Sequence, residues 1–214
     1  MLFYPKIQGS RNTPIGRCVA FEKYDGSNLH WDWEKEFGWH SFGTRRDEFD
    51  FSSNGLDRFK VAHANLDGCA ALFLSTIADG LERVFKDNEH YASFTSFRVF
   101  TEYLGSNSFA GLHKPDDPKQ LVLFDVWADT FGMVGPKQFV EDFGHLQIAK
   151  VVYEGRLTGT FAEDVRMGKY GVAEGVVCKG GNGGTDVWMA KIKTYAYMEK
   201  LKRAFADRWE DYWE

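Results

Sequence analysis

The chain is poor in the features that mark secreted or membrane proteins. Its three cysteines, Cys18, Cys69 and Cys178, are odd in number, widely spaced and without any C-x-x-C pair, which argues against both a disulfide framework and a zinc site. No apolar run approaches the roughly 18 residues that a membrane span requires, and no positively charged leader precedes an apolar stretch. We therefore expect a cytoplasmic protein that needs no membrane, and the sequence leaves open whether a phage encodes it.

An excess of basic residues is absent as well. The formal net charge is −5, and this balance argues against a protein that coats nucleic acid by bulk electrostatics. It is compatible with a local basic groove, because basic residues recur in three short groups, at 44–46, 191–193 and 200–203. For the last of these groups we favour solvated surface.

Repeats, low-complexity tracts and proline-rich linkers are also missing, since the five prolines are scattered along the chain. The chain is instead rich in apolar and aromatic residues: 43% of its 214 residues are hydrophobic and 16% are aromatic. That content is enough for one sizeable core. One folded domain is the economical interpretation.

Short runs of aromatic and β-branched residues, bounded by turn residues, predict a framework of strands. We expect these strands over residues 17–23, 28–34, 37–44, 97–103, 121–127, 175–179 and 187–192. The segment DGSN after Lys23 is predicted to be a hairpin turn, and GGNGG at 180–184 a flexible hairpin loop rather than a phosphate-binding loop. Apolar residues at helical spacing over 66–85, with Asn65 as the cap, predict one helix packed on a sheet.

One lysine stands where a buried strand residue is expected. In FEKYDGSNLHWDW, residues 21–33, Lys23 and Asp25 lie among large apolar side chains. A single K-x-D-G match is weak, because average residue frequencies produce one by chance in roughly one chain in twenty of this size. The motifs that follow in order strengthen it: FTEYLG with Glu102, LVLFDVWAD with Phe124 and Asp125, AEGVVCKG with Glu174 and Lys179, and WMAKIK with Lys191 and Lys193.

This ordered set resembles the covalent nucleotidyltransferases, the superfamily of polynucleotide ligases and mRNA capping enzymes, in which a lysine takes up a nucleotide through a phosphoramidate bond. The resemblance covers residues 16–194. It implies an α+β fold of antiparallel β-sheets with flanking helices, an ATP-grasp-like nucleotidyltransferase domain over residues 1–195. Residues 196–214 would be a C-terminal amphipathic helix packed on that domain, with no separate second domain. One helical stripe carries its apolar residues, Met198, Leu201, Phe205, Trp209 and Tyr212.

Asn28 is the residue that indicates which branch of this superfamily the chain resembles. DNA ligases and capping enzymes typically carry arginine five positions after the nucleophile, whereas RNA ligases of the RNA ligase 2-like type carry asparagine there. The stretch EKYDGSN, with Glu22 before the lysine, is similar to the RNA ligase form, although Tyr24 followed by Asp25 is a common DNA-ligase pairing. A small DNA ligase, a capping-type nucleotidyltransferase and a ligase-derived binding module without turnover stay open as alternatives.

The resemblance makes Lys23 the nucleophile. A free lysine with a pKa near 10.4 is unprotonated in only about four molecules per ten thousand at pH 7, so an attacking lysine must be activated. Lys191 and Lys193 project to the same side of an alternating strand. With Mg²⁺ or Mn²⁺ they would disfavour a third positive charge and draw in the α-phosphate. Glu174 would orient the lysine or bind the metal ion, which prefers oxygen ligands.

Four further residues would bind the nucleotide by the same resemblance. Glu102 would accept hydrogen bonds from the ribose hydroxyls, as an ionised carboxylate does well. Phe124 would stack on the adenine. Glu22 and Asn28 complete the predicted site, with Asn28 contacting the reacting phosphates in the later steps.

Two assignments stay open in the sequence. Asp125 points to the opposite side of the strand from Phe124, which makes it a structural candidate. Arg45 or Arg46 matches the place of a phosphate-contacting basic residue in the family, and strand alternation would let only one of the two face the pocket.

The reaction implied by the resemblance has three steps: Lys23 attacks ATP and releases pyrophosphate, AMP passes to a 5′-phosphate end, and a 3′-hydroxyl displaces AMP to join the strands. ATP is preferred to NAD⁺ because Lys23 lies too near the start for an additional N-terminal module. The expected partners are RNA ends, in a nicked duplex or a broken RNA. Only about twenty residues follow the last motif, where ligases usually have a second domain. A protein partner that replaces this domain is therefore a further expectation.

Overall fold

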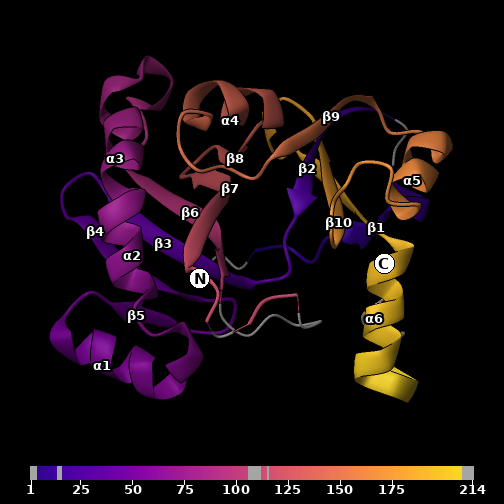
Figure 1. Cartoon of the computed structure of the whole chain (residues 1–214). Coiled ribbons are helices and arrows are strands. Elements are labelled where there is room, and N and C mark those ends of the chain that lie inside the picture. Colours follow the sequence, from indigo (N-terminus) through magenta and orange to yellow (C-terminus); the bar gives the residue numbers. More distant parts are fainter. Residues whose placement is uncertain (1–3, 14–15, 106–111, 115, 209–214) are drawn as a thin grey trace.

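Two β-sheets form the frame of the part that the computed structural model describes, residues 4–13, 16–105, 112–114 and 116–208 (Figure 1). Five strands form one sheet, in spatial order β1 (Gln8–Gly9), β12 (Trp188–Lys193), β10 (Gly175–Gly180), β2 (Arg17–Lys23) and β9 (Val151–Arg156). Seven strands form the other, in spatial order β11 (Gly183–Gly184), β8 (Gly132–Val134), β7 (Gln120–Ala128), β6 (Ser96–Leu104), β3 (Ser27–Glu34), β4 (Gly38–Thr44) and β5 (Glu48–Asp50). Neighbouring strands are antiparallel, except that β1 pairs with β12 in parallel.

The helices flank these sheets. They are α1 (Ser53–Ala62), α2 (Cys69–Thr76), α3 (Ala78–Asp87), α4 (Pro136–Phe143), α5 (Gly159–Arg166) and α6 (Tyr195–Phe205), with short 3₁₀ turns η1 (Ser10–Asn12), η2 (Ala64–Leu66) and η3 (Glu89–Tyr91). In Figure 1 the helices α1 to α3 lie beside the seven-stranded sheet, and α5 and α6 lie beside the five-stranded sheet. The predicted α+β fold of antiparallel sheets with flanking helices is confirmed. No helix among these residues is both long and apolar enough to span a bilayer.

Strand alternation places the core. In β3, Leu29, Trp31 and Trp33 are buried on the face toward the helices. Trp31 stacks on Phe73 of α2 with ring centroids 4.0 Å apart, an arrangement that buries a large apolar area. A second, smaller apolar cluster lies between the five-stranded sheet and α5, where Phe161 packs. Each sheet therefore has one face against helices and one face available to the site.

The segment after Lys23 is not a hairpin turn, which corrects that prediction. β2 pairs with β10 and β9, whereas β3 pairs with β4 and β6, so residues 24–26 cross from one sheet to the other. Glycine is required at the crossing, because a Cβ on Gly26 would lie 2.5 Å from the carbonyl oxygen of Tyr103. Turn residues predict a change of direction but not which strand pairs next.

The single helix predicted over residues 66–85 is two helices. Gly68 adopts a left-handed φ of 83° and caps α2, and a further break at Ile77 separates α2 from α3. Asn65 lies in η2 and caps neither helix. The apolar spacing identified the buried face correctly, with Cys69, Phe73 and Leu81 in the core, but spacing reports which side is buried and not whether the helix is continuous.

The glycine-rich segment is also more ordered than predicted. Gly180 ends β10, and Gly183 and Gly184 form β11, which pairs with Val134 and Met133 of β8. The segment therefore reaches from the five-stranded sheet to the edge of the other sheet. Gly183 and Gly184 have φ of 134° and 64°, values that glycine adopts without the strain of a side chain.

In the C-terminal segment the helix α6 packs on the body of the protein. Tyr197, Met198 and Leu201 of α6 are buried. Trp209 and Tyr212, predicted to extend this stripe, lie outside the described residues.

Candidate active site

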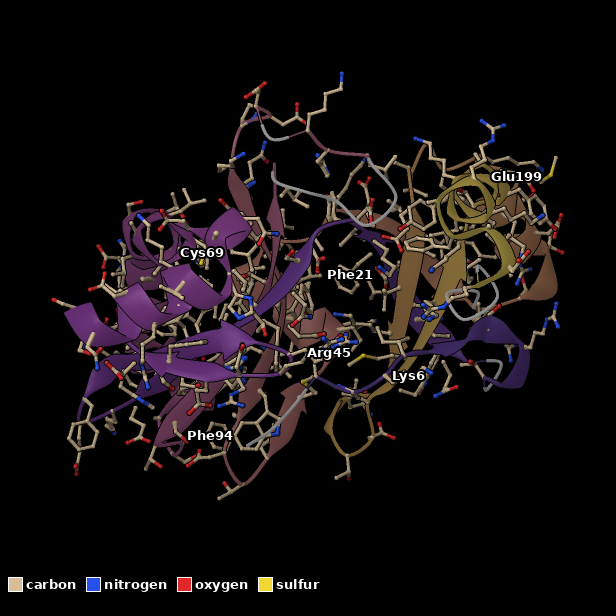
Figure 2. The ribbon with its side chains drawn as sticks, turned by 90° about the horizontal axis from the view of Figure 1, so that it is seen from below. Lys6, Phe21, Arg45, Cys69, Phe94 and Glu199 are labelled. Carbon is tan, nitrogen blue, oxygen red and sulfur yellow. The ribbon has the colours of Figure 1, made fainter. Side chains whose placement is uncertain are left out.

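A cavity of about 510 Å³ is lined by residues of both sheets. Its lining includes nine of the predicted site residues: Glu22, Lys23, Asn28, Arg45, Glu102, Phe124, Glu174, Lys191 and Lys193. They come from β2, β3, β6, β7 and β12, from the residue directly before β10 and from the residue directly after β4. Figure 2 labels Phe21, Arg45 and Lys6, three lining residues that lie between the two halves of the molecule. Motifs far apart in sequence thus meet at one place.

Lys23 forms an ion pair inside this cavity. Its Nζ lies 2.8 Å from Oε1 of Glu174, and the two side chains are 28% and 3% exposed. The pairing of Gly175 with Lys23 in neighbouring strands brings the two residues together. Burial lowers the pKa of Lys23, but the charges of Glu174, Glu102 and Asp25 outweigh it, so the net shift is upward.

The carboxylates around Lys23 act in the opposite sense to the effect expected from its two lysine neighbours. The sequence interpretation had Lys191 and Lys193 disfavouring a positive charge on Lys23, whereas the carboxylates around Lys23 favour that charge. Burial and the charges of Lys23 and Lys191 lower the pKa of Lys193 to about 8, against the opposing effect of Glu174.

Glu102 lies across the crossover from Lys23. It pairs with Asn28 in the β3–β6 ladder, and its Oε1 accepts a hydrogen bond from the backbone N–H of Gly26 at 3.2 Å. Burial raises the pKa of Glu102 to about 7, with Lys23 opposing and Glu174 adding to the shift. Glu22 and Asn28 are half-buried on the wall of the same cavity.

Phe124 faces the cavity because of a bulge in β7. The register between β6 and β7 shifts at this point, so that Phe100 pairs with Asp125 and Thr101 with Leu123. Phe124 is the additional residue, and such bulges re-aim a side chain. Asp125 does not line the cavity, in keeping with its interpretation as a structural residue.

Asp125 anchors a buried network behind Phe124. Its carboxylate pairs with Lys179 Nζ at 2.7 Å and accepts a hydrogen bond from the hydroxyl of Tyr4. Lys179 also donates to the carbonyl oxygen of Phe124 at 2.5 Å. Tyr4 meets the Phe124 ring edge-on, with centroids 5.1 Å apart. These contacts hold Phe124 in place.

The two arginines are distinguished by the structure. Arg45 lines the cavity and Arg46 does not. Both follow the end of β4 at Thr44 and lie in a bend, so strand alternation is not what separates them.

Several lining residues carried no prediction, namely Tyr4, Lys6, Asp25, Lys179 and Tyr197. Tyr197 donates a hydrogen bond to Asp25 Oδ1 at 2.9 Å from 172 positions away. K-x-D-G and the AEGVVCKG motif contain Asp25 and Lys179, so the motifs could have nominated them. No local signal indicates Tyr4 or Tyr197, because their contacts exist only in the folded chain.

The cavity contains a candidate position for a divalent cation. Oε2 of Glu174 is buried and has no hydrogen-bond partner among the described residues. A carboxylate oxygen of this kind is the ligand that Mg²⁺ and Mn²⁺ prefer. The donor set therefore fits the predicted metal role of Glu174.

We compared the sequence and the structure of the chain with those of known proteins. No protein-family model matches the sequence, and no curated protein matches it. The chain is similar in structure to an RNA ligase from Naegleria gruberi solved with ATP and Mn, with a TM-score of 0.61 and 16% identity over 94% of this chain and 58% of that one. It is also similar to an archaeal ATP-dependent RNA ligase, with a TM-score of 0.59 and 18% identity over 96% of this chain and 52% of that one.

The chain thus spans little more than half the length of these two ligases. At this level of identity the likeness concerns the fold. The resemblance that the ordered motifs predicted is confirmed at that level: the chain has the nucleotidyltransferase-type fold of ATP-dependent RNA ligases.

Proposed function

We propose that the chain is the adenylylating domain of an ATP-dependent RNA ligase, which joins 5′-phosphate and 3′-hydroxyl ends through a lysyl-AMP intermediate. The observation that carries the proposal is the meeting of Lys23, Glu102, Glu174 and Lys193 around one cavity. Its volume of about 510 Å³ falls in the range of small-molecule sites, about 300–1,000 Å³. The similarity in structure to RNA ligases also supports the proposal.

In the first step the Nζ of Lys23 attacks the α-phosphorus of ATP. A P–N bond forms, the bond to pyrophosphate breaks, and the lysine proton leaves beforehand because the nitrogen lone pair is the nucleophile. Glu174 Oε1, at 2.8 Å, is the neighbouring acceptor that orients this amine. Lys191 and Lys193 hold the phosphates and stabilise the charge that builds on them.

Other lining residues bind the rest of the nucleotide. Phe124 offers its ring to the adenine, and Glu102 accepts hydrogen bonds from the ribose hydroxyls. Glu22 and Arg45 line the same cavity, and Arg45 would contact a phosphate. A Mg²⁺ or Mn²⁺ ion held by Oε2 of Glu174 would supply neutralisation of the phosphate charge.

In the later steps AMP moves from Lys23 to the 5′-phosphate of an RNA end, and the 3′-hydroxyl then attacks that phosphate with AMP as the leaving group. Asn28 on the cavity wall contacts the reacting phosphates, and asparagine at this position favours RNA over DNA ends by resemblance. Because the chain spans about half of the similar ligases, we assign RNA docking in part to a protein partner or a further domain.

The test is covalent labelling. Protein stripped of bound AMP with pyrophosphate is mixed with Mg²⁺ and α-labelled ATP or, separately, GTP, and label that survives denaturing electrophoresis is measured. We expect label from ATP that disappears in Lys23→Ala and in Lys23→Arg, since arginine keeps the charge but is not nucleophilic. Lys169→Ala, at an exposed ion pair with Asp164, is the matched control that keeps full labelling.

Three outcomes contradict the proposal. Label from GTP alone indicates a capping-type enzyme, and a labelled protein that joins nicked DNA but not RNA indicates a DNA ligase. No label from either nucleotide indicates a binding module that has lost turnover.

A further inference from the structure

The C-terminal helix contributes one side chain to the candidate site. Tyr197 lies in the first turn of α6 (yellow in Figure 1), is 2% exposed and lines the cavity. Its hydroxyl donates to Asp25 Oδ1 at 2.9 Å. Asp25 belongs to the K-x-D-G segment and lies two positions after Lys23. The helix therefore reaches the crossover segment that directly follows Lys23.

The start of α6 is fixed to other parts of the same site. Thr194, the N-cap, accepts a hydrogen bond from the backbone N–H of Tyr197 at 3.1 Å through its side chain. The Thr194 hydroxyl donates to the carbonyl oxygen of Ala173 at 3.1 Å, and its N–H donates to that of Glu174 at 2.8 Å. N-caps of this kind define where a helix begins. The position of Tyr197 is thus set by the backbone beside Glu174.

The ring of Tyr197 contacts a second residue of the site, Lys193. Lys193 Nζ lies 5.4 Å from the ring centroid, within the distance at which an aromatic face attracts a cation. Burial and the charges of Glu174 and Asp25 raise the pKa of Tyr197, so the phenol keeps its proton and stays a donor. One side chain contacts both the K-x-D-G carboxylate and a lysine predicted to hold phosphate.

We propose that Tyr197 is a positioning residue of the lysyl-AMP step: its hydroxyl fixes Asp25 and the crossover segment that follows Lys23, and its ring supports Lys193. This inference rests on the proposed function. Misplacement of reacting groups by about 1 Å can cost on the order of a hundredfold in rate, so a tether of this kind controls attack more than it controls nucleotide binding.

The experiment compares Tyr197→Phe with Tyr91→Phe. Tyr91 is also buried and donates to a carboxylate, Asp142 Oδ2 at 2.6 Å, but it does not line the cavity. Both variants lose one tyrosine–aspartate hydrogen bond, so both are expected to lower the melting temperature. At saturating ATP, Tyr197→Phe should slow single-turnover adduct formation about tenfold, with the half-saturating ATP concentration within about twofold of the unchanged protein. Tyr91→Phe should leave the rate within about twofold.

A second variant separates the two contacts of the side chain. Tyr197→Leu removes the ring as well as the hydroxyl, and we expect it to be slower than Tyr197→Phe because Lys193 loses its support. Equal rates in Tyr197→Phe and Tyr91→Phe would overturn the inference. So would a loss that raising the ATP concentration fully restores, since that result describes a binding residue.

Hydrogen exchange gives a readout that does not require catalysis. In Tyr197→Phe the amides over residues 24–28 should exchange about fivefold faster, as expected for the loss of one hydrogen bond that holds the segment, whereas in Tyr91→Phe they should not change. Unchanged exchange over this segment in Tyr197→Phe would refute the tether even if ATP labels the protein. Faster exchange in a protein that takes up no label would instead refute the proposed function and leave the tether standing.

Discussion

Two buried carboxylates in this molecule are held in opposite ways. Asp32, in the seven-stranded sheet, accepts hydrogen bonds on both oxygens, from Arg98 Nε at 2.5 Å, Arg98 Nη2 at 2.8 Å and Ser41 Oγ at 2.8 Å. Glu174, directly before β10, has Lys23 on one oxygen and no hydrogen-bond partner on the other among the described residues. Their side chains are 10% and 3% exposed, so burial does not explain the difference.

The contrast separates a structural ion pair from a site prepared for a ligand. A buried carboxylate is tolerated when hydrogen bonds replace the lost water, and Asp32 meets that condition fully. Glu174 does not, and burial raises its pKa despite the opposing charges of Lys23 and Lys193. Incomplete pairing at the wall of a cavity is a physical signature of function. The two carboxylates should therefore respond to substitution in opposite ways.

We expect the largest effect, a loss of stability, at the fully hydrogen-bonded pair of Asp32 and Arg98. Asp32→Ala leaves the guanidinium of Arg98 with Glu48 but without its bidentate partner, and removing one member of a buried pair destabilises by about 3 kcal/mol. Chemical denaturation should show this loss as a lower midpoint with an unchanged slope. Adduct formation by the folded fraction should stay within about twofold, because neither Asp32 nor Arg98 lines the cavity.

The control for this variant is Glu48→Ala. Glu48 also accepts from Arg98, at 2.9 Å, but its side chain is 34% exposed, so its loss should cost about 1 kcal/mol or less. Equal destabilisation by the two substitutions would show that burial and pairing at Asp32 do not set its energy.

At the incompletely paired Glu174 we expect the reverse: a large loss of rate without a loss of stability. Glu174→Gln keeps the shape and one acceptor for Lys23 but removes the charge, so we expect the rate of adduct formation to fall about a hundredfold. The melting temperature should be equal to or above that of the unchanged protein, because an incompletely paired buried charge has been removed. Loss of stability with a preserved rate would make Glu174 a second structural carboxylate and end the distinction.

The same contrast explains what the sequence could predict. Lys23, Glu174 and Lys193 were predicted because the resemblance to a known family gives those residue types in a fixed order, and strand pairing brings them together at one cavity. Tyr197 and Tyr4 support the site from 172 and 121 positions away from their partners. Such contacts depend on the tertiary fold, and a tyrosine in an apolar pattern looks the same whether it fills a core or holds a carboxylate.

The sequence likewise predicted only part of the fold. Strands whose apolar residues alternate, such as β3, were predicted, and Leu29, Trp31 and Trp33 of that strand are buried. β9 was missed because its residues are exposed or half-buried without an alternating pattern of burial, and α4 and α5 have only eight residues each. The crossover at Gly26 and the break before α2 depend on backbone geometry, which side-chain periodicity does not report.

His30 supplies the smallest effect and the sharpest test of the comparison. Its Nε2 is buried without a hydrogen-bond partner among the described residues, 3.9 Å from Asp32 Oδ2 and 3.7 Å from Glu48 Oε2. It therefore resembles Glu174 Oε2, yet it does not line the site cavity. Burial and the charge of Arg98 lower the pKa of His30, against the opposing carboxylates.

A lowered pKa means that the unfolded chain binds this proton more tightly than the folded protein. Stability should therefore fall as the pH drops through about 6.5, by on the order of 1 kcal/mol. The difference in melting temperature between pH 7.5 and pH 5.5 should shrink in His30→Gln, which cannot take up the proton. An unchanged difference would mean that folding does not shift the pKa of His30, and a larger difference in His30→Gln would mean that folded His30 is already charged and paired with the carboxylates. The cluster around Arg98 would then be fully paired, and Glu174 alone of the two would keep the character of a ligand site.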